Sequence, residues 1–134
     1  MKENTLMTNP LANQPIEETC VLEGEHRPWG NYLVLRDLPH YKCKQLQVLP
    51  HQRLSLQLHH HREEYWIITQ GEGLLTLGES VQAVSKGSMI HIPIETKHRL
   101  ENTGNVLLEL VEIQLGASFE ESDIVRFDDD YQRC

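Results

Sequence analysis

A chain of 134 residues suits one domain, and with 39% hydrophobic residues it can build a packed core without disulfide bonds. Its formal net charge of −8 argues against a nucleic-acid backbone as the partner. No stretch approaches the ~20 apolar residues of a membrane span, and the N-terminus lacks a signal-peptide pattern. Three cysteines without a C-x-x-C unit fit a reduced, cytoplasmic protein, in which Cys43 is expected to be a small core residue.

Along the chain, residues 1–19 lack periodicity and predict a flexible tail. Short apolar runs separated by turn residues follow, with almost no helical period, which predicts an all-β sandwich or barrel. The expected strands cover residues 32–35, 41–50, 54–61, 65–69, 73–77, 88–93 and 106–115. Ser118 and Glu121 have the spacing of a capping box, so one short helical turn is expected within residues 118–127.

Acidic residues gather near the C-terminus and are interpreted as a solvated, solubilising edge. They are Glu120, Glu121, Asp123, Asp128, Asp129 and Asp130. The predicted organisation is a tail at residues 1–19, a β domain at 20–127 and an acidic tail at 128–134.

Residues 54–64, LSLQLHHHREE, carry the strongest chemical signal of the sequence. Polar and apolar side chains alternate, so one face of the expected strand presents Ser55, Gln57, His59 and His61. Alternate residues stand ~6–7 Å apart, and two such side chains can converge on one ion. Amide, imidazole and carboxylate groups are ligands that Zn, Mn, Co or Ni accept. The alternative interpretation of the three consecutive histidines is a surface tract.

The spacing over a longer stretch resembles the cupin superfamily, with its motifs G-x5-H-x-H-x3,4-E-x6-G and G-x5-P-x-G-x2-H-x3-N. The positions that match are His59, Glu64, Gly71, Gly87, Pro93, His98 and Asn102, and Gln57 stands at the position of the first His. This resemblance implies an all-β double-stranded β-helix, or jelly-roll barrel, with one divalent metal ion, zinc being expected and Mn, Co or Ni being the alternatives. It assigns the ligands as Gln57, His59, Glu64 and His98, with His61 pointing into the cavity outside the ligand set and His60 facing away.

The chain further resembles the C-terminal domain of type II phosphomannose isomerases over residues 26–133. The matching blocks are Arg27-Pro28-Trp29-Gly30-x-Tyr32, Tyr41-Lys42-x-Lys44, Leu54-Ser55-Leu56-Gln57-x-His59-His60-His61-Arg62, His98-Arg99-Leu100-Glu101-Asn102 and Asp123-Ile124-Val125-Arg126-Phe127. The resemblance implies interconversion of mannose 6-phosphate and fructose 6-phosphate, so the expected partner is a small phosphorylated sugar.

That reaction needs a base that moves a proton between C1 and C2 of the sugar. Two candidates stay open: His61 shares the metal face, and Glu112 alternates with the apolar residues of the strand expected at 106–115. The phosphate needs cations, and Arg62 is the first candidate because it directly follows the ligand strand. The other basic residues in matching blocks are Lys42, Lys44 and Arg126.

Four positions depart from the family pattern. His51, Glu95 and Gln132 replace glycines, and Tyr65 stands where the family usually has His. Because glycine adopts backbone angles that other residues resist, two loops are expected to be shaped differently, and Glu95 is expected to bring negative charge near a phosphate.

Two other functions remain open. One is a cupin that binds a sugar or nucleotide sugar without turnover. The other is an iron oxygenase, against which Gln57 argues because oxygenase cupins usually use three His and one carboxylate. A homodimer is also expected, since Val21, Leu22 and the strand at 32–35 can extend a neighbour's sheet.

Overall fold

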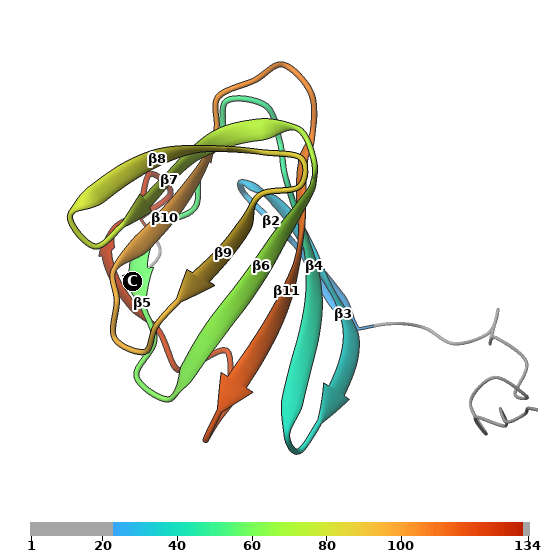
Figure 1. Cartoon of the computed structure of the whole chain (residues 1–134), viewed down its shortest axis with the longest axis vertical. Coiled ribbons are helices and arrows are strands. Elements are labelled where there is room, and N and C mark those ends of the chain that lie inside the picture. Colours follow the sequence, from blue (N-terminus) through green and yellow to red (C-terminus); the bar gives the residue numbers. More distant parts are fainter. Residues whose placement is uncertain (1–22, 133–134) are drawn as a thin grey trace, which may run out of the picture.

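The computed structural model describes residues 23–132, which form eleven antiparallel β-strands and no helix (Figure 1). The strands are β2 (Gly24–Arg27), β3 (Gly30–Leu38), β4 (Tyr41–Val48), β5 (Leu56–Leu58), β6 (Arg62–Gln70), β7 (Glu72–Leu77), β8 (Ser80–Ser85), β9 (Met89–Ile92), β10 (His98–Asn102), β11 (Leu108–Gly116) and β12 (Val125–Asp128). Within the described part of the chain there is no long apolar helix of the kind that crosses a membrane.

The strands form two sheets that face each other. One sheet has the order β12-β5-β10-β7-β8 and the other has the order β2-β3-β4-β11-β6-β9. The non-consecutive neighbours, such as β10 beside β5 and β11 between β4 and β6, mean that the chain crosses repeatedly from one sheet to the other. This is the arrangement of a double-stranded β-helix, so the expected fold is confirmed.

Inward-facing side chains on three neighbouring strands change together from apolar to polar or charged. Leu110 of β11 pairs with Leu46 of β4 and Ile68 of β6, whereas four residues further on Gln114 pairs with Lys42 and Glu64. Side chains two residues apart share one face of a strand, so these pairs form successive layers across the sheet. One end of the interior is therefore an apolar core, and the other end is a polar cavity.

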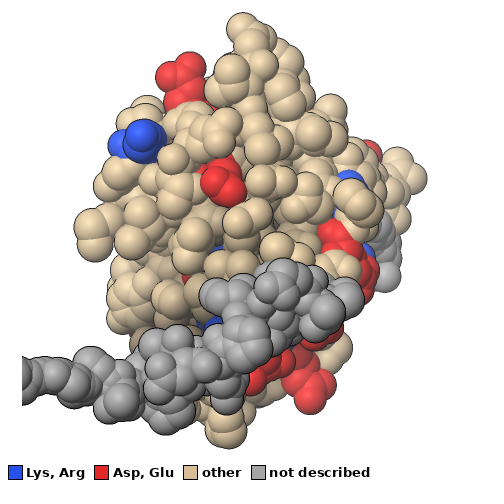
Figure 2. Space-filling model, turned by 90° about the vertical axis from the view of Figure 1, so that its right-hand side faces the viewer, with Lys and Arg blue, Asp and Glu red and all other residues tan. Residues whose placement is uncertain are grey.

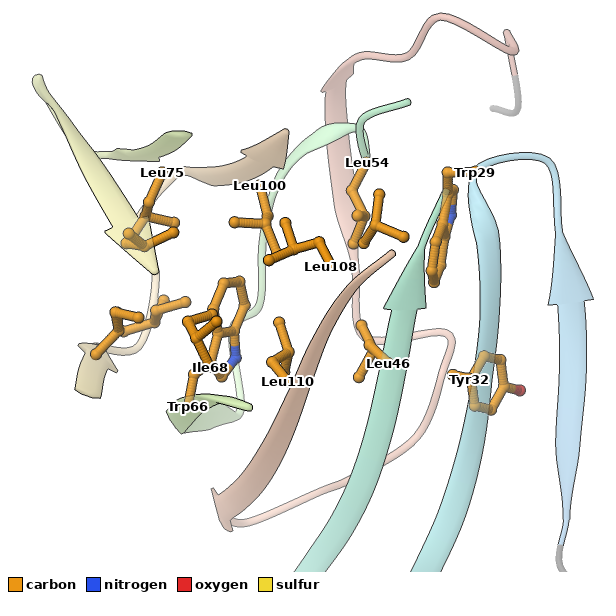
Figure 3. Packing of buried hydrophobic residues seen from close by; sticks show 14 of the residues in the cluster. Trp29, Tyr32, Leu46, Leu54, Trp66, Ile68, Leu75, Leu100, Leu108 and Leu110 are labelled. Atoms are coloured by element: carbon orange, nitrogen blue, oxygen red, sulfur yellow. The ribbon is translucent and has the colours of Figure 1, made fainter. Parts of the chain in front are cut away.

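The apolar end holds the packed core (Figure 3). Trp66, Ile68 and Leu110 lie side by side in it, and Trp29 packs near Leu54. Leu75, Leu100 and Leu108 have no exposed surface. Trp29 and Trp66 are both at least 95% buried. This core holds the two sheets at a fixed spacing, which sets the distance between polar side chains at the other end.

The seven expected strands are present, but several boundaries and four other strands were not predicted. The strand expected over residues 54–61 is only β5, Leu56–Leu58, and β2, β8, β10 and β12 were not expected. The helical turn expected within residues 118–127 is wrong: residues 117–124 form a loop, and β12 follows. β10 escaped prediction because its sequence HRLEN is polar, although four of its five residues are buried.

The C-terminal acidic residues are not simply a solvated edge. Asp123 is 91% buried, Asp128 pairs with Arg99, and Asp130 pairs with Arg53. Tyr131 packs against the core. Contacts with the β domain therefore continue beyond residue 127, the end predicted from the sequence. The tail predicted at residues 1–19 lies outside the described residues.

Figure 2 shows the side of the molecule at which β3 lies in Figure 1. Outside the area that the grey atoms cover, this face carries isolated charged side chains rather than a broad patch of either sign. Cys43 of β4 is half-buried on the outer face of the sheet, so the expectation that it is a core residue is wrong; its neighbours Lys42 and Lys44 face inward instead.

Candidate metal centre

A cavity of about 100 Å³ occupies the polar end of the barrel. Both sheets contribute to its wall. The charged and polar residues that line it are Arg27, Lys44, Ser55, Gln57, His59, Arg62, Glu64, His98, Glu112, Glu121 and Arg126. Most of them come from strand positions next to the apolar layers, so the cavity adjoins the packed core.

Three buried residues in this wall form a cluster that can hold a metal ion. One ligand atom each from His59, Glu64 and His98 lies within 4.8 Å of the other two. They come from the end of β5, from β6 and from β10, and are brought together because β5 and β10 pair with Gln57 opposite His98. All three are residues that the motif spacing assigned as ligands.

The hydrogen bonds of the two histidines leave the correct nitrogen available. Nδ1 of His59 lies 2.6 Å from the carbonyl oxygen of Asp123, and Nδ1 of His98 lies 2.9 Å from that of Thr96. A carbonyl only accepts, so in each neutral ring Nδ1 carries the proton and Nε2 carries the lone pair. Burial lowers the pKa of both rings, that of His59 to about 4, which keeps them neutral at pH 7.

The carboxylate of Glu64 is held from both sides. Oε1 accepts a hydrogen bond from Nε1 of Trp66 at 3.0 Å, and Oε2 accepts one from Nε of Arg62 at 2.9 Å. Burial would raise the pKa of Glu64, but attraction by His59, His98 and Arg62 outweighs burial and holds that pKa well below its usual value. Glu64 is therefore an oriented anion at the centre of the cluster.

Gln57, the fourth assigned ligand, lines the same cavity and is 91% buried. It lies on β5 with His98 of β10 opposite it on one side and Arg126 of β12 on the other. Its amide is therefore placed among the cluster residues, where an oxygen ligand would complete a set of two imidazoles and a carboxylate.

His61 does not point into the cavity, and this part of the prediction is wrong. β5 ends at Leu58, and the chain turns at residues 59–61, so the alternation that placed His61 beside His59 stops. The turn is fixed by Asp123, whose carboxylate accepts hydrogen bonds from the backbone N–H groups of His60 and His61. As a result His61 is exposed, as is His60, which bonds to Glu95.

Glu112, the other candidate base, does lie in the cavity wall. It is 97% buried on β11, between Lys44 of β4 and Trp66 of β6. Burial and repulsion by Glu64 raise its pKa to about 7, although Lys44 and Arg62 pull the other way. Gln114 donates a hydrogen bond to its Oε2. Glu112 can therefore exchange a proton near neutral pH.

Arg62 lies inside the barrel and is 95% buried. Besides Glu64, its guanidinium contacts the carbonyl oxygen of Glu120 at 3.2 Å and Nε2 of His59 at 3.4 Å. Three donors are thus directed at the cluster and the loop beside it. Arg62 orients the proposed ligands rather than standing open to an incoming phosphate.

Of the other expected basic residues, Lys44 and Arg126 line the cavity wall. Lys42 is 94% buried but lines a second pocket, together with residues 117–121. Glu121, which the sequence suggested as part of a solvated edge and of a capping box, lies 2.7 Å from Nζ of Lys44 and 3.5 Å from Nζ of Lys42. No local sequence pattern predicts this contact, because Glu121 lies 77 residues after Lys44 in the chain.

The departures from the family pattern all lie outside the cavity. His51, Glu95 and Gln132 keep the left-handed backbone of a glycine, with φ of 64°, 61° and 56°. The expectation of differently shaped loops is therefore wrong. Glu95 and Tyr65 are exposed, and neither side chain reaches the cavity wall. None of the four side chains lines the cavity.

The residues present fit a divalent metal ion. Two neutral imidazoles with unprotonated Nε2 atoms, one ionised carboxylate and one nearby amide form a mixed nitrogen and oxygen donor set. Backbone carbonyls fix both imidazoles, and two side chains fix the carboxylate, which is the kind of support that metal ligands require.

Known proteins resemble this chain in sequence. Residues 15–129 match the model of the family "Mannose-6-phosphate isomerase C-terminal". The xanthan biosynthesis protein XanB of Xanthomonas campestris pv. campestris is 43% identical over 108 residues, covering 81% of this chain and 23% of that protein. The mannose-1-phosphate guanylyltransferase of Salmonella montevideo is 41% identical over 144 aligned residues, covering 98% of this chain and 31% of that protein. The chain thus spans about a quarter to a third of these relatives.

Solved structures share the fold at low sequence identity. The capsular polysaccharide assembling protein CapF of Staphylococcus aureus superposes with a TM-score of 0.71 at 15% identity, over 81% of this chain and 33% of that one. An uncharacterized protein with a double-stranded β-helix domain from Klebsiella pneumoniae gives 0.64 at 15% identity, over 72% and 83%. Sequence and fold agree that this chain is a cupin domain belonging to the mannose-6-phosphate isomerase C-terminal family.

Proposed function

We propose that this chain is a metal-dependent aldose–ketose isomerase that interconverts mannose 6-phosphate and fructose 6-phosphate. The observation that carries the proposal is a single cavity in which the His59–Glu64–His98 cluster lies near a buried acid, Glu112, with a pKa of about 7. The family and its relatives in mannose metabolism support the choice of substrate.

In this proposal His59, Glu64, His98 and Gln57 hold one divalent ion, with zinc expected and Mn, Co or Ni as alternatives. When bound, the ion supplies a Lewis acid that stabilises negative charge on O1 and O2 of the sugar. Arg62 and Trp66 keep the carboxylate of Glu64 in place through its two oxygens. The carbonyls of Asp123 and Thr96 keep the imidazoles in the required tautomer.

Glu112 is the proposed base. Its carboxylate removes the proton from C2 of the aldose, and the electron pair left on C2 forms the double bond of an enediol as the aldehyde oxygen O1 takes up a proton. Return of the proton to C1, with loss of the O2 proton, gives the ketose. A group whose pKa lies near the working pH both accepts and returns a proton efficiently. His61 is no longer a candidate for this step because it is exposed.

Lys42 and Lys44 are the proposed phosphate ligands, with Arg126 as a further cation at the cavity wall. Both lysines project inward from β4, on the same side of the strand as the core residues. Arg62, the first candidate from the sequence, is assigned to Glu64 instead. A phosphate dianion bound by the lysines would place the sugar carbons on the side of Glu112. Glu112 pairs with Lys44 across the strands.

The test is an isomerase assay on mannose 6-phosphate after loading the metal-free chain with Zn, Mn, Co or Ni in turn. We expect formation of fructose 6-phosphate with at least one metal. Glu112→Gln, which keeps the shape of the side chain, should lower turnover by about 10²- to 10⁴-fold while metal content stays the same. Binding of mannose 6-phosphate without any product would instead favour a sugar-binding cupin. Oxygen consumption with bound iron would favour an oxygenase.

A homodimer and a cytoplasmic location remain predictions. Val21 and Leu22, which suggested the dimer, lie outside the described residues, and Tyr32 and Val34 of β3 face the core. The exposed apolar side chains of the described residues include Ile67 on β6 and Met89 on the edge strand β9, which offer a different contact area. Light scattering at micromolar concentration distinguishes a dimer from a monomer.

A further inference from the structure

A single carboxylate from the loop between β11 and β12 bridges the two buried lysines of β4. Oε2 of Glu121 lies 2.7 Å from Nζ of Lys44 and 3.5 Å from Nζ of Lys42. The lysines are almost fully buried, whereas the side chain of Glu121 is 43% exposed. The anion that satisfies the lysines therefore comes from the outside of the barrel and closes over them.

Within ion-pair distance, the two ammonium groups share one carboxylate. Lys42 adds a carbonyl contact, to Phe119 at 3.3 Å, and Lys44 lies 4.2 Å from the centre of the Tyr32 ring and faces Glu112 across the strands. Buried cations favour a nearby anion strongly, and a dianion would satisfy two of them better than one carboxylate does. The attraction of Lys44 and Lys42 outweighs burial and holds the pKa of Glu121 below its usual value.

The loop is held at both ends, and contacts to buried cations hold its middle. At its start, the N–H of Ala117 bonds to the carbonyl of His61, and at its end Asp123 binds the turn at residues 59–61. Between them, the carbonyls of Phe119 and Glu120 accept hydrogen bonds from Lys42 and Arg62, whereas the side chain of Glu121 is 43% exposed. Loops of this kind move with few residues changing conformation, so Glu121 can leave the lysines while Asp123 stays in place.

We propose that Glu121 is a displaceable substitute for the substrate's phosphate: it closes the anion site of Lys42 and Lys44 in the free protein and swings out when a phosphate binds. The loop at residues 117–124 is then a gate over the cavity, which Glu121 lines. The inference rests on the proposed function only in naming the phosphate of the sugar as the anion that displaces Glu121.

In this arrangement, the apparent association constant for phosphate equals the intrinsic one multiplied by the fraction of molecules whose gate is open. Removing the charge of Glu121 should remove that competition. In Glu121→Gln we expect the dissociation constant of inorganic phosphate, measured by calorimetry on the full chain, to fall by at least about fivefold. The matched control is Glu120→Gln, which removes the same charge from the same loop without a side-chain bond to the lysines, and it should stay within about twofold of the wild type.

A second variant ties the effect to the lysines. If phosphate instead binds at the metal centre, Lys44→Met in the Glu121→Gln background will leave the tighter binding intact, which overturns the proposal. Loss of the gain in the double variant supports it. Equal or weaker phosphate binding in Glu121→Gln than in the wild type also overturns it.

A measurement on the wild type avoids dependence on a variant that folds poorly. With saturating inorganic phosphate, amide hydrogen exchange of residues 118–122 should become faster, because the contacts of Glu121 with the lysines are lost. Slower or unchanged exchange there contradicts a gate. The isomerase assay is independent of both results: turnover with unchanged phosphate binding in Glu121→Gln removes only the gate, and tighter phosphate binding without turnover removes only the isomerase.

Discussion

Nε of Arg62 donates a hydrogen bond to Oε2 of Glu64 over 2.9 Å, and both side chains are buried on the inner face of β6. This pair predicts that Arg62→Ala weakens metal binding, because it leaves the carboxylate of Glu64 with only one of its two orienting partners, Trp66. Loss of such support typically lowers metal affinity by about 10- to 100-fold. Arg62→Lys keeps the charge but not the planar guanidinium, so it should rescue affinity only in part.

The measurement for Arg62 is competition for zinc against a chelator, with thermal denaturation of the metal-free variants. Arg53→Ala is the control, since Arg53 pairs with Asp130 at the surface and its loss should cost ~0–1 kcal/mol. Unchanged metal affinity together with lost phosphate binding in Arg62→Ala would return Arg62 to the phosphate role.

The ligand assignment makes a separate prediction about two residues of one segment. Gln57→Ala should lower metal affinity, because Gln57 is buried in the cavity wall, whereas His61→Ala should leave it unchanged, because His61 is exposed. Metal content after dialysis and turnover of mannose 6-phosphate are measured on both variants. Loss of metal in His61→Ala with normal binding in Gln57→Ala would reverse the assignment.

The cluster residues could be predicted from the sequence because two distant motifs constrain them at once. Spacing within the first motif fixed His59 and Glu64, and the second motif added His98, which β10 brings opposite β5. His61 was misplaced because the alternation rule holds only while the strand continues. β5 ends at Leu58, and the contacts that bend the chain there come from Asp123, more than sixty residues away.

The anion site of Lys42 and Lys44 was only partly predictable. Hydropathy alone favours the opposite orientation of β4, with Cys43 inside and the lysines in solvent. Buried lysines are stable only with partners, and the partner Glu121 comes from a loop that was expected to be a helical turn. Such conflicts between the hydropathy pattern of a strand and the burial of its side chains are typical of functional sites.

Glu95 allows a test of backbone conformation apart from function. Its φ of 61° lies in the left-handed region, which costs a non-glycine residue about 1–2 kcal/mol, partly offset by the flexibility that glycine would add to the unfolded chain. Glu95→Gly should therefore leave the free energy of unfolding within about 1 kcal/mol, even though the contact with His60 is lost. Glu95→Val should destabilise by more than Glu95→Gly, because branched side chains resist this region.

Urea denaturation of the Glu95 variants at pH 7 provides the measurement. Glu95→Ala separates the two effects, since it removes the contact with His60 and keeps an ordinary side chain at the position. A Glu95→Gly variant destabilised by more than Glu95→Val would contradict the account from backbone angles.

The buried titratable groups of the cavity give opposing pH dependences in the metal-free protein. His59 has its pKa lowered from 6.5 to about 4, chiefly by burial, so between these values the unfolded chain binds the extra proton and stability rises with pH. Glu112 has its pKa raised from 4.5 to about 7, so between those values the folded chain keeps the extra proton and stability falls with pH. The two contributions oppose each other from about pH 4.5 to 6.5.

Glu112→Gln removes the second contribution and should expose the first. We expect the free energy of unfolding of the metal-free variant to rise with pH more steeply than that of the wild type, by up to about 1.4 kcal/mol per pH unit between pH 4.5 and 6.5. Urea denaturation in the presence of a chelator at pH 4.5, 5.5 and 6.5 measures the difference. Glu109→Gln, which changes a carboxylate on the same strand but outside the cavity wall, is the control and should follow the wild type. Parallel curves for wild type and Glu112→Gln would mean that Glu112 ionises normally, and would remove it as the base that works near neutral pH.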